Sequence, residues 1–161
     1  MKKGVCHVVG AGDFTAGLLK REEGDMVIAC DGGYRYLQDL GIPCDICVGD
    51  FDSLGYTPDF SNTVRLPKEK DVTDMEAGIR LGMERGYESF VLYGALGGRR
   101  LSHTIANIQC LLYLKEHNAV GYLMDGTGMI LVAKEEEISF QDSLEGYMSL
   151  FSMGDKATVS I

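Results

Sequence analysis

The sequence predicts an α/β fold, a Rossmann-like and mostly parallel sheet with helices on both faces. Three observations predict it. Short apolar runs recur along the first 124 residues, segments with helical periodicity separate several of them, and polar stretches rich in glycine follow the apolar runs. Strands that alternate with helices favour a parallel sheet covered on both sides. Hydrophobic residues make up 45% of the chain, which is enough for a buried core.

The apolar runs are short enough to be strands, and the segments between them repeat apolar residues at three- and four-residue intervals. We expect strands at 5–9, 26–30, 46–48, 63–66, 90–93 and 121–124, and helices at 34–40, 71–85 and 102–116. The apolar faces expected for the last two helices consist of Met75, Ile79 and Met83, and of Ile105, Ile108 and Leu112.

The pattern changes near residue 125, where short alternating runs replace the helical segments. We expect an α/β nucleotide-binding catalytic domain at 1–124 and the beginning of a β-sandwich domain at 125–161, with strands at 129–133, 147–151 and 157–161. The second segment is shorter than a full β-sandwich, which needs about 100 residues. An incomplete sheet exposes unpaired edges, so the last two strands are predicted to pair with another chain or to be disordered.

Composition excludes several classes of protein. The net charge of -9 disfavours a nucleic-acid-binding protein, which normally carries a basic face. No apolar run approaches membrane-spanning length, and no secretory signal is present, so no membrane partner is expected. Five cysteines, an odd number, indicate reduced thiols and a cytoplasmic location. The Cys44-x-x-Cys47 pair allows a redox or zinc site, but a structural role is favoured because no second pair follows.

Aspartates follow several of the predicted strands, at the edge where parallel sheets bind ligands. Four motifs meet there: Asp31-Gly32-Gly33, Gly49-Asp50-Phe51-Asp52-Ser53, Lys70-Asp71-Val72-Thr73-Asp74 and Gly97-Gly98-Arg99. Clustered carboxylates repel one another unless a cation lies among them, and oxygen ligands completed by phosphates suit Mg²⁺. If the backbone is extended there, Asp50 and Asp52 point to the same side.

Each motif alone also has a structural interpretation. Asp31-Gly32-Gly33 is compatible with a simple turn, and Gly97-Gly98 with a flexible loop. Asp71 can cap the helix expected at 71–85, with Asp74 in its first turn near the positive end of the dipole. Only the conjunction of the motifs at one edge favours a functional site.

Two glycine-containing stretches resemble phosphate-binding motifs. Gly12 and Gly17 have the spacing of a P-loop, but Leu18-Leu19 stands where Lys-Ser/Thr is required, which excludes it. Gly10-Ala11-Gly12 follows the first predicted strand, and Asp31 lies about twenty residues further on, as in NAD-type dinucleotide-binding domains. A dinucleotide-dependent oxidoreductase is therefore the alternative hypothesis, although it leaves the other aspartates without a function.

In order and spacing, the four motifs resemble those of thiamine pyrophosphokinases. The resemblance implies transfer of a pyrophosphoryl group from ATP to the hydroxyl of thiamine, with release of AMP, by a magnesium-dependent homodimer. It implies that Asp50, Asp52 and Asp74 are metal ligands, with Asp71 beside them as a further catalytic residue. It also implies that Thr73 and Asp125 bind the substrate. The ATP contacts implied are Asp31, Gly32, Gly33, Ser53, Lys70, Arg99 and His103.

The sequence departs from the family pattern after Gly97-Gly98-Arg99. One additional residue is present, and Ser102 stands where an aspartate is usual, although Ser102 can still cap the following helix. Gly128 replaces a usual asparagine. Family members also continue beyond the position that matches Ile161, so an inactive fragment that binds nucleotide is a third hypothesis.

Overall fold

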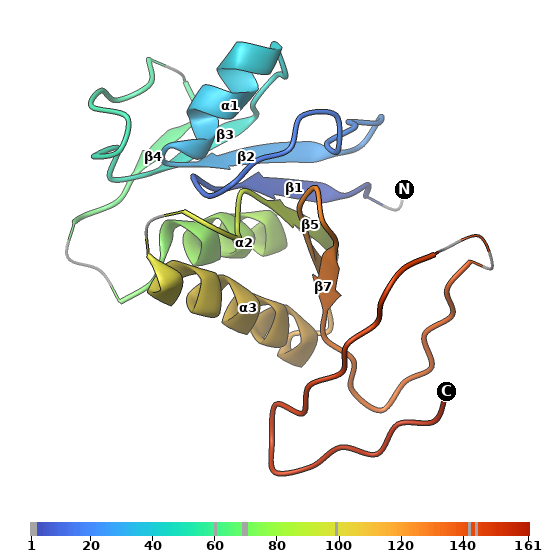
Figure 1. Cartoon of the computed structure of the whole chain (residues 1–161). Coiled ribbons are helices and arrows are strands. Elements are labelled where there is room, and N and C mark those ends of the chain that lie inside the picture. Colours follow the sequence, from blue (N-terminus) through green and yellow to red (C-terminus); the bar gives the residue numbers. More distant parts are fainter. Residues whose placement is uncertain (1–2, 60, 69–70, 99, 142, 144) are drawn as a thin grey trace.

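A computed structural model describes residues 3–59, 61–68, 71–98, 100–141, 143 and 145–161 of the chain. Within these residues, a seven-stranded sheet lies between one helix on one face and two helices on the other (Figure 1). The α/β fold with helices on both faces is therefore confirmed. None of the helices in these residues has the length and apolar character needed to cross a membrane.

The sheet has the strand order β4-β3-β2-β1-β5-β6-β7. All neighbouring pairs are parallel except β6 and β7, which are antiparallel. The six predicted strands are present, with small differences at their ends. The strands are β1 (Cys6–Val9), β2 (Met26–Cys30), β3 (Ile46–Gly49), β4 (Thr63–Arg65), β5 (Ser89–Tyr93), β6 (Val120–Met124) and β7 (Met129–Leu131).

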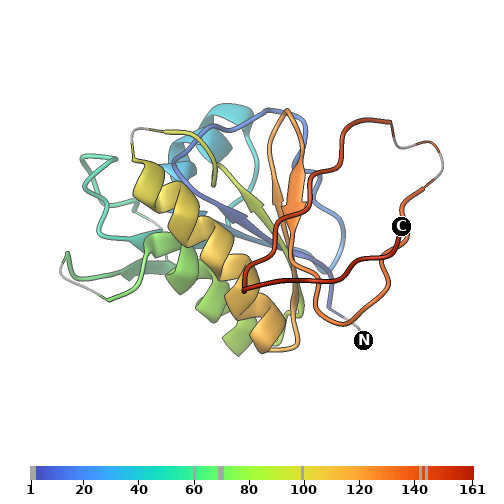
Figure 2. The same ribbon diagram turned by 60° about the horizontal axis from the view of Figure 1, so that its bottom comes forward.

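The sheet separates two hydrophobic clusters, each of which lies between one face of the sheet and the helices that cover it. Helix α1 (Gly33–Leu40) covers one face, whereas α2 (Asp74–Glu84) and α3 (Leu101–Glu116) lie side by side on the other (Figures 1 and 2). Adjacent strand residues point to opposite faces, so Val8 packs under α2 and α3 while Val9 packs under α1. Both faces of the central strands are buried, as expected for a parallel sheet.

Helix α2 packs closely on the sheet along the expected face. Met75 and Ile79 are buried, and Met83 is partly buried against the same cluster. Gly78 allows the close approach, because a Cβ atom at this position would lie 2.7 Å from Cys30 Sγ. A side chain at residue 78 would therefore push the helix away from the sheet.

Helix α3 turns a different face to the sheet from the predicted one. Its buried residues are Asn107, Cys110, Leu111 and Leu114. Ile105 is 51% exposed, so its assignment to the buried face was wrong, whereas Ile108 packs partly against the core. The helix carries apolar residues on more than one side, so its pattern alone did not determine its rotation.

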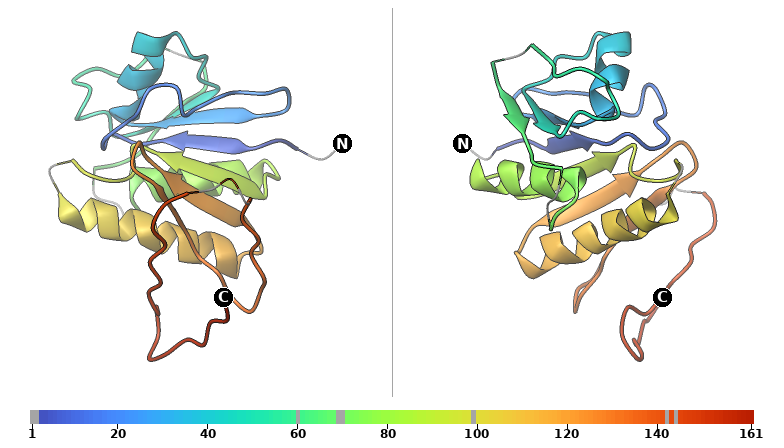
Figure 3. Two further views of the ribbon diagram at one scale, coloured as in Figure 1. Left: turned by 45° about the vertical axis from the view of Figure 1, so that its right-hand side comes forward. Right: turned by 90° about the vertical axis from the view of Figure 1, so that its left-hand side faces the viewer.

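The chain beyond β6 only partly follows the prediction. The expected strand at 129–133 forms as β7, which pairs with β6 and extends the α/β sheet. In the described residues after Leu131 there is no helix or strand, so the strands expected at 147–151 and 157–161 are not formed. Figure 3 shows this segment as a long irregular loop that extends away from the sheet. Tyr147 and Phe151 in this segment are exposed. A strand needs a partner for its backbone groups, and the described residues after Leu131 form no backbone hydrogen bond with another segment. The division at residue 125 stays a prediction.

A buried polar group connects β1, the residue that precedes β2, and the last residue of β5. His7 is 5% exposed, and its Nε2 lies 3.0 Å from Asp25 Oδ2 while its Nδ1 lies 3.3 Å from the Tyr93 hydroxyl. Asp25 also accepts hydrogen bonds from the backbone N–H groups of Val5 and Glu22. Burial by itself raises the pKa of Asp25, but the bonds from Glu22, Val5 and His7 together lower it below the usual 3.8.

We expect the Asp25 carboxylate to stabilise the fold at neutral pH and to make its stability fall in acid. Because its folded pKa is depressed, its contribution is fully present above pH 3.8 and is lost as the pH falls through the folded pKa. Asp25→Asn places an N–H group against a backbone donor and should cost about 1–3 kcal/mol at neutral pH. Urea unfolding at several pH values measures both effects.

The matched control is Asp39→Asn, an exposed residue at the end of α1, which should change the unfolding free energy by less than about 0.5 kcal/mol. Equal stability of the two variants at neutral pH would contradict a structural role for Asp25.

Candidate functional site

The candidate site lies where the carboxyl ends of the parallel strands meet. The chain proceeds outward from β1 to β4 and then returns through α2 to β5 on the other side of β1. Ligands of open α/β sheets bind at such a reversal of strand order. The loops that follow β2 and β3 and the N-terminal ends of α2 and α3 lie at this edge of the molecule (left in Figure 1).

Three carboxylates converge at this edge. Asp31 follows β2, Asp50 follows β3 and Asp74 begins α2, and each offers an oxygen within 4.8 Å of the others. Asp31 is only 7% exposed, and its Oδ1 atom is buried without a hydrogen-bond partner among the described residues. A buried oxygen of this kind calls for an explanation, and a cation that accepts all three carboxylates as ligands supplies one.

The backbone around Asp31 fixes its carboxylate in place. Its φ of 47° turns the chain sharply at the end of β2, a conformation that aspartate tolerates better than most residues. Its N–H donates to the Val48 carbonyl oxygen at 2.8 Å, which extends the pairing of β2 and β3 by one residue. A Cβ atom on Gly49 would lie 3.1 Å from Asp31 Cβ, so a glycine leaves room for this turn.

Phe51 separates the two aspartates that follow β3. Its side chain is 3% exposed, and its backbone has a φ of 62°, an unfavourable conformation for a bulky residue that its burial holds in place. The Asp52 N–H donates to Asp50 Oδ1 at 3.1 Å across this turn. The chain is therefore not extended here, so the condition under which Asp50 and Asp52 were expected to point to the same side is not met.

Asp52 lies outside the three-carboxylate cluster and pairs with Lys68. The distance from Lys68 Nζ to Asp52 Oδ2 is 2.9 Å, and both side chains are exposed. The hydrogen bond and charge of Asp52 raise the pKa of Lys68. Lys68 was not among the predicted site residues, although it lies two positions before Lys70 in the sequence. The role of Asp52 as a metal ligand stays a prediction.

Thr73 rather than Asp71 caps the N-terminus of α2. The Thr73 Oγ1 atom accepts a hydrogen bond from the Glu76 N–H at 3.1 Å, which caps the helix. Asp74 occupies the first turn, as predicted, where the positive end of the helix dipole stabilises its charge. Because Thr73 caps the helix, the capping role considered for Asp71 was wrong. Asp71 is exposed and is not a member of the three-carboxylate cluster.

The glycine loops after β1 and β5 are bound to each other. The N–H groups of Gly10, Gly12 and Asp13 donate to the carbonyl oxygens of Tyr93, Gly94 and Leu96 at 2.7–2.8 Å. No helix lies between β1 and β2, a stretch that the structure describes completely. A dinucleotide site needs a helix N-terminus at this point, so the structure contradicts the oxidoreductase hypothesis.

Asn107 holds the loop after β5 from the side of α3. Its side chain is buried, and its Nδ2 donates to the Ala95 carbonyl oxygen at 2.7 Å. Sequence analysis gave Asn107 no role, although a polar residue among the apolar positions of a helix was the available signal.

The remaining predicted contacts lie around the same edge. Gly32 and Gly33 form the N-terminus of α1, and Ser53 and His103 are exposed, the latter in the first turn of α3. Ser102 lies inside α3, whose N-cap is Arg100 without a side-chain hydrogen bond, so the expected capping by Ser102 was wrong. Lys70 and Arg99 lie outside the described residues.

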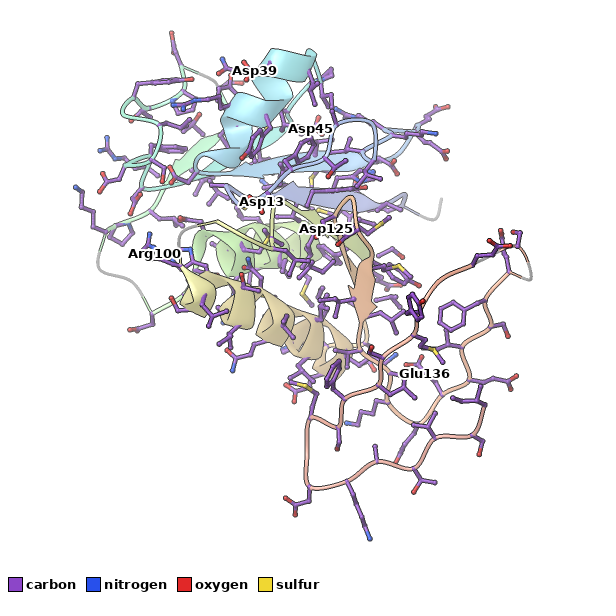
Figure 4. All side chains as sticks on the ribbon, in the orientation of Figure 1. Asp13, Asp39, Asp45, Arg100, Asp125 and Glu136 are labelled. Atoms are coloured by element: carbon purple, nitrogen blue, oxygen red, sulfur yellow. The ribbon has the colours of Figure 1, made fainter. Side chains whose placement is uncertain are left out.

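Asp125 closes the hairpin between β6 and β7 (labelled in Figure 4). Its Oδ1 atom accepts hydrogen bonds from Thr127 N and Oγ1, both at 2.7 Å, and from Gly128 N at 3.0 Å. The pKa of Asp125 is lowered, mainly by the two hydrogen bonds from Thr127. The contacts of Oδ1 in this structure are therefore those of a turn.

Comparison with known proteins agrees with the motifs. The family described as "Thiamin pyrophosphokinase, catalytic domain" matches residues 19–123. No significant match was found among curated proteins.

Solved structures add a similarity in three dimensions. A thiamin pyrophosphokinase from Geobacillus thermodenitrificans is 29% identical, with a TM-score of 0.60 over 76% of this chain and 60% of that one. The thiamine pyrophosphokinase from Bacillus subtilis is 25% identical, with a TM-score of 0.62 over 76% of this chain and 61% of that one. A probable thiamine pyrophosphokinase from Staphylococcus saprophyticus is 28% identical, with a TM-score of 0.62 over 81% and 68%.

The chain thus spans about 60% of the length of the first two relatives. The family match covers the strands and helices that bring Asp31, Asp50 and Asp74 together. On these grounds the chain belongs to the thiamin pyrophosphokinase catalytic-domain family.

Proposed function

We propose that this chain binds ATP together with Mg²⁺ at the carboxyl edge of its sheet and supports pyrophosphoryl transfer to thiamine. The observation that carries the proposal is the cluster of Asp31, Asp50 and Asp74, whose oxygens approach within 4.8 Å in a chain of the pyrophosphokinase family. The buried and unpartnered Asp31 Oδ1 atom supports a ligand role in particular.

Electrostatics explains why a cation is needed for this function. The chain carries a net charge of -9, and three carboxylates face the site where the phosphates of ATP would lie. Anionic phosphates and carboxylates repel each other in the absence of an intervening positive charge. A bound Mg²⁺ supplies that charge and polarises the phosphoryl oxygens.

The residues of the chain have separate proposed roles. Asp31, Asp50 and Asp74 hold the metal, and Asp52 is a further proposed ligand. Lys68, the partner of Asp52, borders the phosphates and offsets negative charge. The family resemblance adds phosphate and nucleotide contacts from Gly32, Gly33, Ser53, Lys70, Arg99 and His103. These groups orient the phosphates for in-line attack, and such transfers depend mainly on positioning and electrostatics.

In the proposed reaction, the hydroxyl oxygen of thiamine attacks the β-phosphorus of ATP. The bond from that phosphorus to the oxygen bridging to the α-phosphate breaks, AMP leaves, and a nearby aspartate such as Asp71 accepts the hydroxyl proton. Thr73 and Asp125 are proposed thiamine contacts, although Asp125 Oδ1 already accepts three hydrogen bonds. A cytoplasmic homodimer, with 125–161 as part of a second domain, completes the proposal.

A second candidate is a fragment that binds nucleotide without turnover. It is favoured by the extent of the match, because the aligned part of this chain corresponds to 60% of the relative from Geobacillus thermodenitrificans. Both candidates share the metal site and differ in the chemical step.

If the three carboxylates bind Mg²⁺, Asp50→Asn should increase the stability of the metal-free protein and decrease its affinity for Mg²⁺. Asp50→Asn keeps the side-chain oxygen that accepts from Asp52, but it removes one charge from the cluster. In the presence of chelator, the variant should be more stable than the wild type because repulsion is relieved. With Mg²⁺, it should bind the ion about 10- to 100-fold more weakly. Calorimetric titration and thermal unfolding measure the two effects.

Asp39→Asn again serves as control, because it removes one charge at the far end of α1 and should leave Mg²⁺ affinity unchanged. At 100 times its dissociation constant, Mg²⁺ should stabilise the wild type by about 2.7 kcal/mol. If Asp50→Asn binds Mg²⁺ as the wild type does, the three carboxylates are not its site.

The function itself is tested with ATP and thiamine. ATP should bind well with Mg²⁺ and weakly with chelator, NAD(H) should not bind, and AMP should be released when thiamine is added. Asp52→Asn, a surface change worth about 0.5 kcal/mol or less in stability, should abolish turnover if Asp52 is a ligand. Calorimetry and chromatographic detection of AMP provide the measurements.

The outcomes separate the candidates. Magnesium-dependent ATP binding without AMP release identifies the nucleotide-binding fragment. Turnover at the wild-type rate in Asp52→Asn rejects the ligand role of Asp52, and ATP binding that is indifferent to Mg²⁺ rejects both candidates.

A further inference from the structure

Two thiols face each other beside α1, away from the carboxylate cluster. The Sγ atoms of Cys44 and Cys47 lie 3.7 Å apart, although Cys47 is a core residue of β3 and Cys44 precedes the strand. The Cys44 thiol also lies 3.0 Å from the Ile46 carbonyl oxygen. The pair is thus within contact distance without being bonded, as all five cysteines are free.

The bend that brings the two thiols together is held from several sides. Asp45, at its centre, accepts a hydrogen bond from Val27 N at 2.7 Å and donates from its own N–H to Val27 O at 2.9 Å. Arg21 pairs with Asp45 Oδ1 at 2.9 Å and also donates to the Pro43 carbonyl oxygen. Asn62 donates to Asp45 O. The hydrogen bonds and the ion pair at Asp45 therefore hold the two thiols close to each other in the folded chain. Figure 4 labels Asp45 beside α1.

Cys44 is the member of the pair that a reagent can reach. It is half-buried and lines a cavity of about 320 Å³ together with Tyr34, Gln38, Ile42 and Pro43. Cys47 is fully buried. A small molecule that enters the cavity meets the Cys44 sulfur first, and the Cys47 sulfur lies behind it.

Ionisation favours the same order of reaction. The hydrogen bond from Cys47 lowers the pKa of the Cys44 thiol, although burial acts in the opposite direction. The bond to Cys44 and burial raise the pKa of Cys47. In the other three cysteines, burial raises the pKa, for Cys110 to about 12. Thiolate is the reactive form of cysteine, and Cys44 is the cysteine of the five whose pKa is lowered. We therefore expect Cys44 to react faster than the other four.

We propose that Cys44 and Cys47 form a thiol–disulfide exchange site for low-molecular-weight disulfides. The Cys44 thiolate attacks one sulfur of the small disulfide, forms a mixed disulfide and releases one thiolate. Cys47 then loses its proton and attacks Cys44 Sγ, which forms the Cys44–Cys47 disulfide and releases the second thiolate. Two protein thiols are oxidised and one small disulfide is reduced to two thiols, so the exchange needs no other oxidant.

The geometry permits the bond with little rearrangement. A disulfide requires about 2.05 Å between the sulfurs, so they must approach by about 1.7 Å from their observed separation. The Cys44 side chain lies at the cavity and can supply most of this movement, whereas Cys47 is packed in the core. The site is independent of the proposed magnesium and ATP chemistry.

Oxidised glutathione added to the full chain tests the proposal. At intervals the reaction is quenched by alkylation, and peptides are mapped by mass spectrometry. We expect a transient mixed disulfide on Cys44 followed by the Cys44–Cys47 disulfide, which dithiothreitol reverses. Cys6, Cys30 and Cys110 in the same digest are internal controls and should react at least about tenfold more slowly, because one pKa unit changes the thiolate fraction about tenfold.

Two variants separate the steps. Cys47→Ser should retain a stable mixed disulfide on Cys44, and Cys44→Ser should leave Cys47 unmodified on the same timescale. If either variant fails to fold, the early time points of the wild type still identify which sulfur reacts first. A first modification at any other cysteine, or a mixed disulfide on Cys44 that never passes to Cys47 in the wild type, overturns the proposal.

Discussion

The parallel pairing of β2 with β3 is the constraint on which the candidate site depends. The register pairs Cys30 with Val48, and the Asp31 N–H continues the ladder to Val48 O, so both strands end at the same level. Two charged carboxylate oxygens no more than 4.8 Å apart, as in this cluster, repel by about 3.5 kcal/mol or more at an effective dielectric constant near 20. That is a large part of a typical folding free energy, so only a strongly buried pair of strands can keep these groups together.

Helix α2 completes the site because two of its features act at once. Thr73 ends the preceding loop by capping the helix, which places Asp74 in the first turn, where the helix dipole offsets its charge. One turn further on, Gly78 lets the helix approach Cys30 on β2. The third carboxylate is therefore positioned by the packing of a rigid helix against the sheet that carries the first one.

Strand β3 carries two chemically distinct regions. Its carboxyl end leads into Asp50, and its body presents Cys47 to the α1 face, where Cys44 meets it around the bend at Asp45. The buried Phe51 packs in the same cluster as Cys47, so the thiol pair and the turn after β3 share one region of the core. The two regions still face different surroundings, since one gathers anions at the sheet edge and the other borders an uncharged cavity.

By itself, the sequence determined the α/β class, the parallel strands, the edge that carries the site and the family, because strand periodicity and the motifs after each strand are local properties. Tertiary structure decided the rest. Whether Asp50 or Asp52 joins Asp31 depended on the positive φ of Phe51, which burial of its ring enforces. The rotation of α3, the pairing of β7 with β6 and the contact between Cys44 and Cys47 likewise depend on partners distant in the chain or on a bend held by them, and such partners leave no periodic signal along the sequence.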